Sequence, residues 1–198
     1  MTLTDRLLAL GSLTLQDPRA ATRALLAEGV PMPARSIGLL LVAVLSALFI
    51  VLQAAIQPME LDPVTAQMLH SPIQAAIAQW FVLGLSVVLI YRVGRAFGGH
   101  GSFADALLIV VWLQVVMLAL QVLQILVLLV MPPLAGIIAL ASFVIFFWLM
   151  ASFVAELHGF ASRGAVLAGI FATSIAAGLT LGVILILIIG PEAFLANV

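Results

Sequence analysis

Five long apolar segments alternate with short polar stretches along the chain. Each segment reaches the roughly 20 residues that an α-helix needs to cross about 30 Å of hydrocarbon. The segments lie at about residues 36–57, 73–92, 103–131, 134–157 and 164–190. The pattern predicts an all-α membrane protein, a bundle of five transmembrane helices formed by residues 36–198.

The third and fourth segments are separated only by Met131, Pro132 and Pro133. Proline cannot donate the backbone hydrogen bond that continues a helix, and it biases the preceding residue away from helical conformation. One unbroken helix of about 50 apolar residues would exceed a bilayer crossing. We therefore expect a tight hairpin here. The third segment is longer than a perpendicular crossing requires, so we expect it to tilt or to extend beyond the headgroups.

Residues 1–35 precede the first apolar segment and are expected to form a cytoplasmic region. Asp17 followed by Pro18 predicts a helix start, and the glycine and prolines that begin at residue 29 predict its end. Arg19 and Arg23 share one side of this short helix, opposite apolar residues. We expect an amphipathic helix at the headgroup level, although packing against the bundle would give the same pattern.

The basic residues predict the orientation of the chain. All seven are arginines, and in a five-span arrangement they fall on one side of the membrane. They are Arg6, Arg19, Arg23, Arg35, Arg92, Arg95 and Arg163. Because basic residues accumulate in cytoplasmic loops, we expect a cytoplasmic N-terminus and a C-terminus across the membrane. The opposite side would carry the acidic loop around residues 57–72 and the C-terminal tail.

Composition excludes several classes of protein. The chain is 65% hydrophobic and 8% charged, which no soluble domain of 198 residues matches. A net charge of −1 gives no basic surface for nucleic acid, so we expect no nucleic-acid partner. Without cysteine there is no disulfide, thiolate metal site or cysteine nucleophile. We expect no cofactor and no metal.

Two loops expected on the cytoplasmic side concentrate the charged residues and histidines of the bundle. The candidate interaction residues there are Arg92, Arg95, His100, Asp105, Glu156, His158 and Arg163. The alternative is that these residues only end helices and fix their orientation.

Local signals in the first of these loops predict its conformation. Gly98 and Gly99 supply permissive backbone that ends the second segment. Ser102 followed by Asp105 predicts a capped helix start. We also expect Arg95 to pair with Asp105 or with the glutamate of the second loop.

Polar and small residues inside the segments indicate helix packing. Three glutamines share about one face of the third segment: Gln114, Gln121 and Gln124. Interhelical hydrogen bonding explains such a stripe, and a polar passage is the alternative. The fifth segment carries small residues at intervals of four, Gly164, Ala168, Ala172, Ala176 and Thr180, and also a Gly-x-x-x-Gly pair, Gly178 and Gly182. We expect this helix to be buried against neighbours, either in the same bundle or in a second copy.

The stretch from Gly94 to Phe103, Gly-Arg-Ala-Phe-Gly-Gly-His-Gly-Ser-Phe, is similar to the Gly-Gly-x-Gly-Ser-Phe stretch before the third span of the Yip family, the Ypt/Rab-interacting proteins and their bacterial relatives. A Phe-Trp pair in the fourth segment, the Glu156-x-His158 loop and the arginine that follows also resemble the family. The N-terminal Leu-Gln-Asp-Pro-Arg-Ala-Ala stretch looks like bacterial members in particular. The resemblance implies a five-span fold with a cytoplasmic N-terminal segment in a bacterial inner (cytoplasmic) membrane, and no established biochemical activity.

The polar content of the segments narrows the function. Proton relays and ion-coupled carriers need ionisable residues at membrane depth, whereas Asp105, Glu156 and His158 all fall near the cytoplasmic boundary. We expect a non-catalytic scaffold, accessory subunit or binding component that contacts lipid, other membrane proteins or a second copy of itself. Two alternatives stay open. One is a small lipid or solute carrier that uses the glutamines; the other is a metal-dependent enzyme that uses these three residues with His100.

Overall fold

The computed structural model describes residues 2–56 and 71–189, and these residues form helices and short connections without a strand. The all-α class is therefore confirmed for this part of the chain. The helices are α1 (Leu3–Gln16), α2 (Pro18–Ala27), α3 (Met32–Ile56), α5 (Pro72–Ala96), α6 (Phe103–Val130), α7 (Pro132–His158) and α8 (Arg163–Ile189). The last five are long and apolar enough to cross a membrane. The acidic loop around residues 57–70 and the C-terminal tail lie outside the described residues.

Most helix ends follow the local sequence signals. The Asp17 carboxylate accepts hydrogen bonds from the backbone N–H groups of the first turn of α2, as a helix N-cap should. Ser102 caps α6 in the same way, with its Oγ 3.1 Å from the Asp105 backbone nitrogen. Met131 alone separates α6 from α7, so the proline hairpin is confirmed. α3 begins at Met32 rather than at residue 36, because a proline is favourable in the first turn of a helix.

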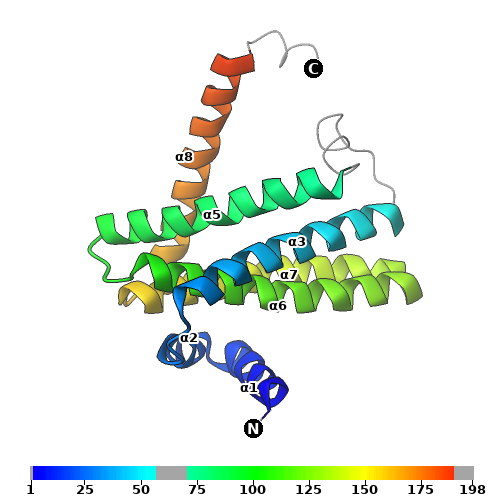
Figure 1. The fold of residues 1–198 in the computed structure, drawn as a ribbon, viewed down its shortest axis with the longest axis horizontal. Coiled ribbons are helices and arrows are strands. Elements are labelled where there is room, and N and C mark those ends of the chain that lie inside the picture. Colours follow the sequence, from blue (N-terminus) through cyan, green and yellow to red (C-terminus); the bar gives the residue numbers. More distant parts are fainter. Residues whose placement is uncertain (1, 57–70, 190–198) are drawn as a thin grey trace.

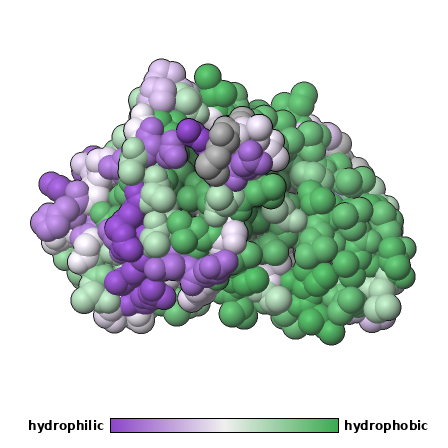
Figure 2. Space-filling view, turned by 90° about the horizontal axis from the view of Figure 1, so that it is seen from below, coloured by the Kyte–Doolittle hydropathy of each residue, from purple (hydrophilic) through white to green (hydrophobic). Residues whose placement is uncertain are grey.

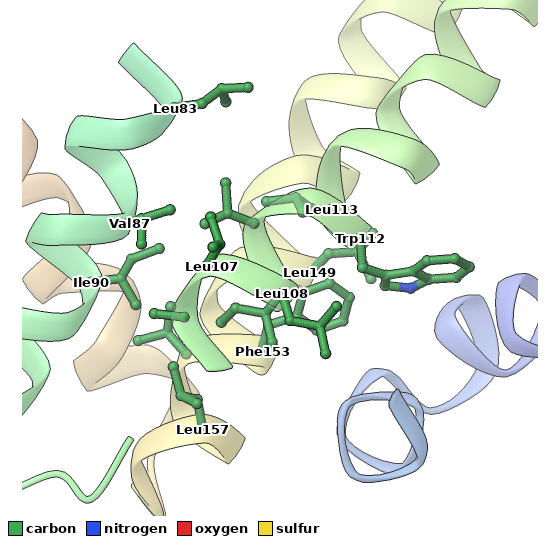
Figure 3. Close-up of a cluster of buried hydrophobic side chains, with 14 of the residues drawn as sticks. Leu83, Val87, Ile90, Leu107, Leu108, Trp112, Leu113, Leu149, Phe153 and Leu157 are labelled. Atoms are coloured by element: carbon green, nitrogen blue, oxygen red, sulfur yellow. The ribbon is translucent and has the colours of Figure 1, made fainter. Parts of the chain in front are cut away.

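Four of the long helices, α3, α5, α6 and α7, lie side by side (Figure 1). α6 occupies the centre and packs against the other three. Figure 3 shows Leu83, Val87 and Ile90 of α5 facing α6, and Leu149 and Phe153 of α7 in the same cluster. Leu149 and Phe153 are 0% and 2% exposed. Since lipid is as apolar as these side chains, close packing and hydrogen bonds must hold such helices together in a bilayer.

The surface is divided into a hydrophilic end and a hydrophobic remainder. Figure 2 shows the hydrophilic residues gathered on one side of the molecule, with a broad hydrophobic surface beyond them. We call the hydrophilic part the polar end; it comprises α1, α2, and the connections at residues 97–102 and 159–162. Arginines, histidines and carboxylates of the two connections and the adjoining helix ends lie here.

The N-terminal region contains two helices where we expected one. α1 starts with a capping box, in which Thr2 and Asp5 each accept a hydrogen bond from the other's backbone N–H. The hydrogen bond from Thr2 lowers the pKa of the Asp5 carboxyl. Near the other end of α1, the Thr14 hydroxyl is fully buried and accepts a 2.9 Å hydrogen bond from Nε1 of Trp112 in α6. This bond fastens α1 to the bundle.

α8 leaves the bundle instead of packing within it (Figure 1). Only its first turns contact the core, through Val166, Leu167 and Ile170. The small residues predicted to pack are exposed, apart from the half-buried Gly182: Gly164, Ala168, Ala172, Ala176 and Gly178. α8 is therefore not buried in its own bundle, which was one of the two expected arrangements. Small residues permit close approach but do not specify which helix approaches, so contact with a second copy stays a prediction.

Candidate functional site

Three groups of polar contacts tie the helices together at the polar end. The first centres on His158, the last residue of α7, whose side chain is almost fully buried at 1% exposure. Its Nδ1 accepts a 3.2 Å hydrogen bond from the Gly101 backbone N–H. Nδ1 therefore carries no proton, so Nε2 carries it and donates to the Ile90 carbonyl oxygen 3.1 Å away. One neutral imidazole thus joins α5, the α5–α6 connection and α7.

Glycines line the space that holds this ring. A Cβ atom on Gly94 or Gly99 would overlap the imidazole of His158, and one on Gly101 would come within 2.8 Å of it. Gly98 alone among the connection's glycines has a left-handed backbone, with φ of 85°. The expectation that Gly98 ends the helix through backbone freedom is confirmed. Gly99 serves a different purpose, because it lets the chain approach the ring. We call this arrangement the histidine socket.

The second tie joins α3 to α6. Nη1 of Arg35 lies 2.9 Å from Oδ1 of Asp105, and Nε of Arg35 donates to the Val30 carbonyl at 2.7 Å. Ser102 donates to the second carboxylate oxygen of Asp105 at 2.6 Å. Arg35 is 8% exposed, so the ion pair is partly desolvated. The prediction that Arg95 pairs with Asp105 is wrong.

The third tie attaches α2 to the end of α7. Nη1 of Arg23 lies 2.8 Å from the Glu156 carboxylate, and Nε of Arg19 lies 3.9 Å from its other oxygen. Arg19 also donates to the carbonyl oxygens of Phe160 and Ala161, at 3.0 and 3.1 Å. The hydrogen bond and negative charge of Glu156 raise the pKa of Arg23. Glu156 is thus paired with α2 rather than with Arg95, which corrects the second half of that prediction.

The remaining predicted residues are exposed and do not take part in the ties. Arg92, Arg95, His100 and Arg163 are exposed, and none of them forms an ion pair with any residue in the described ranges. We call these four residues the basic rim. Asp105, Glu156 and His158 belong to the interior ties, so the structure divides the seven candidates into two sets. Sequence reasoning missed Arg19, Arg23 and Arg35 as the partners of the two carboxylates, and it missed the hydrogen bond between Thr14 and Trp112.

Comparison with known protein families matches residues 13–188 to the Yip1 domain. The match spans all three ties and the five long helices. The chain belongs to the Yip1 domain family. It is accordingly an integral membrane protein with transmembrane helices. Neither the curated proteins nor the solved structures that were compared with the chain gave a match.

Membership of the Yip1 family agrees with the resemblance seen in the stretch from Gly94 to Phe103. The histidine socket gives that stretch a physical role in this chain, since three of its glycines contact the ring of His158. The Glu156-x-His158 pattern likewise places one side chain against α2 and the other in the socket. The residues that carry the resemblance therefore hold the polar end of this Yip1 domain together.

The structure does not assemble the metal site considered from sequence. Within residues 2–56 and 71–189, no three histidine or carboxylate side chains lie close enough to hold a metal ion. Asp105 binds Arg35, Glu156 binds Arg23, and the socket uses both ring nitrogens of His158. Because of these contacts, the other three residues are not available to bind a metal ion together with His100.

The glutamine stripe of this Yip1 domain lies on the central helix α6. Gln114, Gln121 and Gln124 are all half-buried, between the buried core positions and the exposed face. An apolar groove lies elsewhere, between α5, α7 and the start of α8, and none of the three glutamines lines it.

Proposed function

We propose that this Yip1-family protein is a non-catalytic scaffold or accessory component of a bacterial inner membrane, which binds other membrane proteins through the basic rim. The observation that carries the proposal is the division of charge at the polar end. Asp105 and Glu156, at the helix ends beside the two connections, are paired inside the chain, whereas the exposed rim carries three arginines and a histidine. The rim consequently attracts acidic groups of a partner.

The chemistry of the rim supports a protein partner. Three of its four members are arginines, whose planar guanidinium groups bind carboxylates through paired hydrogen bonds. Arginine is also enriched at protein–protein interfaces relative to the rest of the surface. The exposed ring of Phe97 lies between Arg95 and His100 in the sequence and adds an apolar contact. A partner of matching chemistry is an acidic segment next to the membrane surface of another protein.

The ties explain how a small bundle can present such a surface. They fix the ends of α2, α3, α5, α6 and α7 relative to one another. A rigid surface loses less conformational entropy on binding than a mobile one. The ionisable groups of the ties pair with other groups of this chain. We therefore assign them no catalytic role.

The topology that accompanies this proposal has five spans. Helices α3, α5, α6, α7 and α8 cross the membrane, with the N-terminus in the cytoplasm and the C-terminus on the other side. All seven arginines then lie on the cytoplasmic side, as the distribution of basic residues in inner-membrane proteins favours. Residues 1–35 form the cytoplasmic segment, with α1 and α2 at the headgroup level.

Chemical cross-linking and purification from native membranes in mild detergent tests the proposal. The variant Arg92→Gln/Arg95→Gln/Arg163→Gln removes the rim's charge without touching a tie. Arg6→Gln is the matched control, because Arg6 is an exposed arginine in a weak surface ion pair with Glu28. We expect defined membrane-protein partners with wild type and control, and their loss with the triple variant. Equal recovery from all three proteins, or measurable solute flux in liposomes, would contradict the proposal.

A further inference from the structure

An apolar groove of about 430 Å³ runs between α5, α7 and the first half of α8. Its walls include Leu89 and Val93 of α5, Met150 of α7 and Ile170 of α8. We propose that this groove binds one acyl chain of an anionic bilayer phospholipid, whose headgroup lies beside Arg163. The inference needs only insertion of the protein in a membrane. It shares Arg163 with the basic rim and does not otherwise depend on the partner that the rim binds.

The groove is long and mostly apolar, which suits a hydrocarbon chain. On α5 the lining extends from Ser86 to Phe97, a length of about 16 Å at 1.5 Å per residue. A flexible, unbranched acyl chain can lie along an apolar groove of this length, between side chains of α5 and of α8.

The position of the groove makes hydrocarbon available to it. All three helices that form it are long and apolar enough to span a membrane, so a groove between them opens toward lipid chains. The walls are mostly apolar, so water gains few hydrogen bonds there. The hydroxyl of Ser86 donates to the Val82 carbonyl at 2.8 Å, so this hydroxyl needs no hydrogen-bond acceptor from a ligand.

The end of the groove that adjoins the polar end suits an anionic headgroup. Phe97 and Ser162 line the groove there, and Arg163 follows directly as the first residue of α8. Arg163 is exposed and forms no ion pair with any residue that the structure describes. A guanidinium binds phosphate through charge-assisted hydrogen bonds. A phospholipid with one chain in the groove would carry its phosphate at this level.

The test reconstitutes the full-length protein with phosphatidylglycerol that carries a photoreactive group on one acyl chain. After irradiation, mass spectrometry identifies the labelled residues of the protein. We expect labels on the α5 and α8 residues that line the groove. Gly169→Leu places a side chain in the groove, where a Cβ at this position meets no atom within 4 Å. Gly178→Leu is the matched control, because Gly178 also lies on α8 with open space but outside the groove.

Labelling of the groove residues should fall about tenfold in Gly169→Leu, and it should be unchanged in Gly178→Leu. Arg163→Gln should abolish the preference for phosphatidylglycerol over phosphatidylcholine, whereas Arg6→Gln should retain it. Gly169→Leu leaves the basic rim intact, so recovery of protein partners with this variant separates the lipid site from the scaffold role. Equal labelling of both glycine variants with unchanged melting temperatures would overturn the proposal.

A second measurement checks that the groove is open in the membrane. The chain has no cysteine, so a Ser86→Cys/Ser174→Cys variant carries a single pair, one on each wall of the groove. We expect little disulfide formation under oxidation in native membranes. Efficient disulfide formation would mean that α8 closes onto α5 and leaves no room for a lipid chain, which would also overturn the proposal.

Discussion

Replacement of Gly94 by alanine tests the histidine socket. A Cβ at this position would overlap the ring of His158, which is held by hydrogen bonds on both nitrogens. Displacing the ring loses two hydrogen bonds of about 0.5–1.5 kcal/mol each, and overpacking adds about 1–3 kcal/mol. Alanine is favoured over glycine in a helix by about 1 kcal/mol, which offsets part of this cost. We expect a net loss of about 3 kcal/mol in the free energy of unfolding.

The matched control is Gly84→Ala on the same helix, where a new Cβ meets no atom within 4 Å. This substitution should stabilise the protein by about 0.5–1 kcal/mol. When His158 is also replaced by alanine, Gly94→Ala should raise the free energy of unfolding instead of lowering it, because the imidazole no longer meets the new methyl group. Unfolding in mixed detergent micelles measures four variants: Gly94→Ala, Gly84→Ala, His158→Ala and the double variant Gly94→Ala/His158→Ala. Equal stability of Gly94→Ala and Gly84→Ala in the presence of His158 would refute the socket.

Three further predictions concern the other contacts. Arg35→Gln should lower the free energy of unfolding by about 2 kcal/mol, whereas Arg95→Gln should change it by less than about 0.5 kcal/mol, in the same micelle titration. Trp112→Phe removes the hydrogen bond to Thr14 and should lower the free energy of unfolding by about 1–2 kcal/mol. Backbone hydrogen exchange in α1 should become faster, and unchanged exchange there would show that this bond does not hold the helix. Ala172→Leu should leave the melting temperature of the monomer unchanged because Ala172 is exposed, and a large drop would mean that α8 packs within its own bundle.

The fold could be predicted where the sequence carries local signals. Apolar segments of sufficient length indicate the long helices, Asp17 and Ser102 mark helix starts, and the proline pair marks the hairpin. These signals act within a few residues, so they do not depend on the rest of the structure. The capping box between Thr2 and Asp5 is a signal of the same kind and could have predicted α1.

The candidate site could be predicted only in part, because its contacts join residues far apart in the sequence. Asp105 could find an arginine on any neighbouring helix, and its partner Arg35 lies 70 residues away. The spacing of residues also does not distinguish Gly98, which needs a left-handed backbone, from Gly99, which needs to contact an imidazole. The small residues of α8 indicate that another helix can approach it closely, but they do not determine which helix does so.

The scaffold role is tested most directly by a photoreactive amino acid at position 100, in the exposed basic rim but outside the lipid groove. Position 8, exposed on α1, serves as the control. Irradiation of native membranes should cross-link position 100 to an acidic segment of another membrane protein, and the neutral triple-arginine variant should abolish that cross-link. A cross-link that survives removal of the three arginines, or a partner captured equally from position 8, would contradict the account.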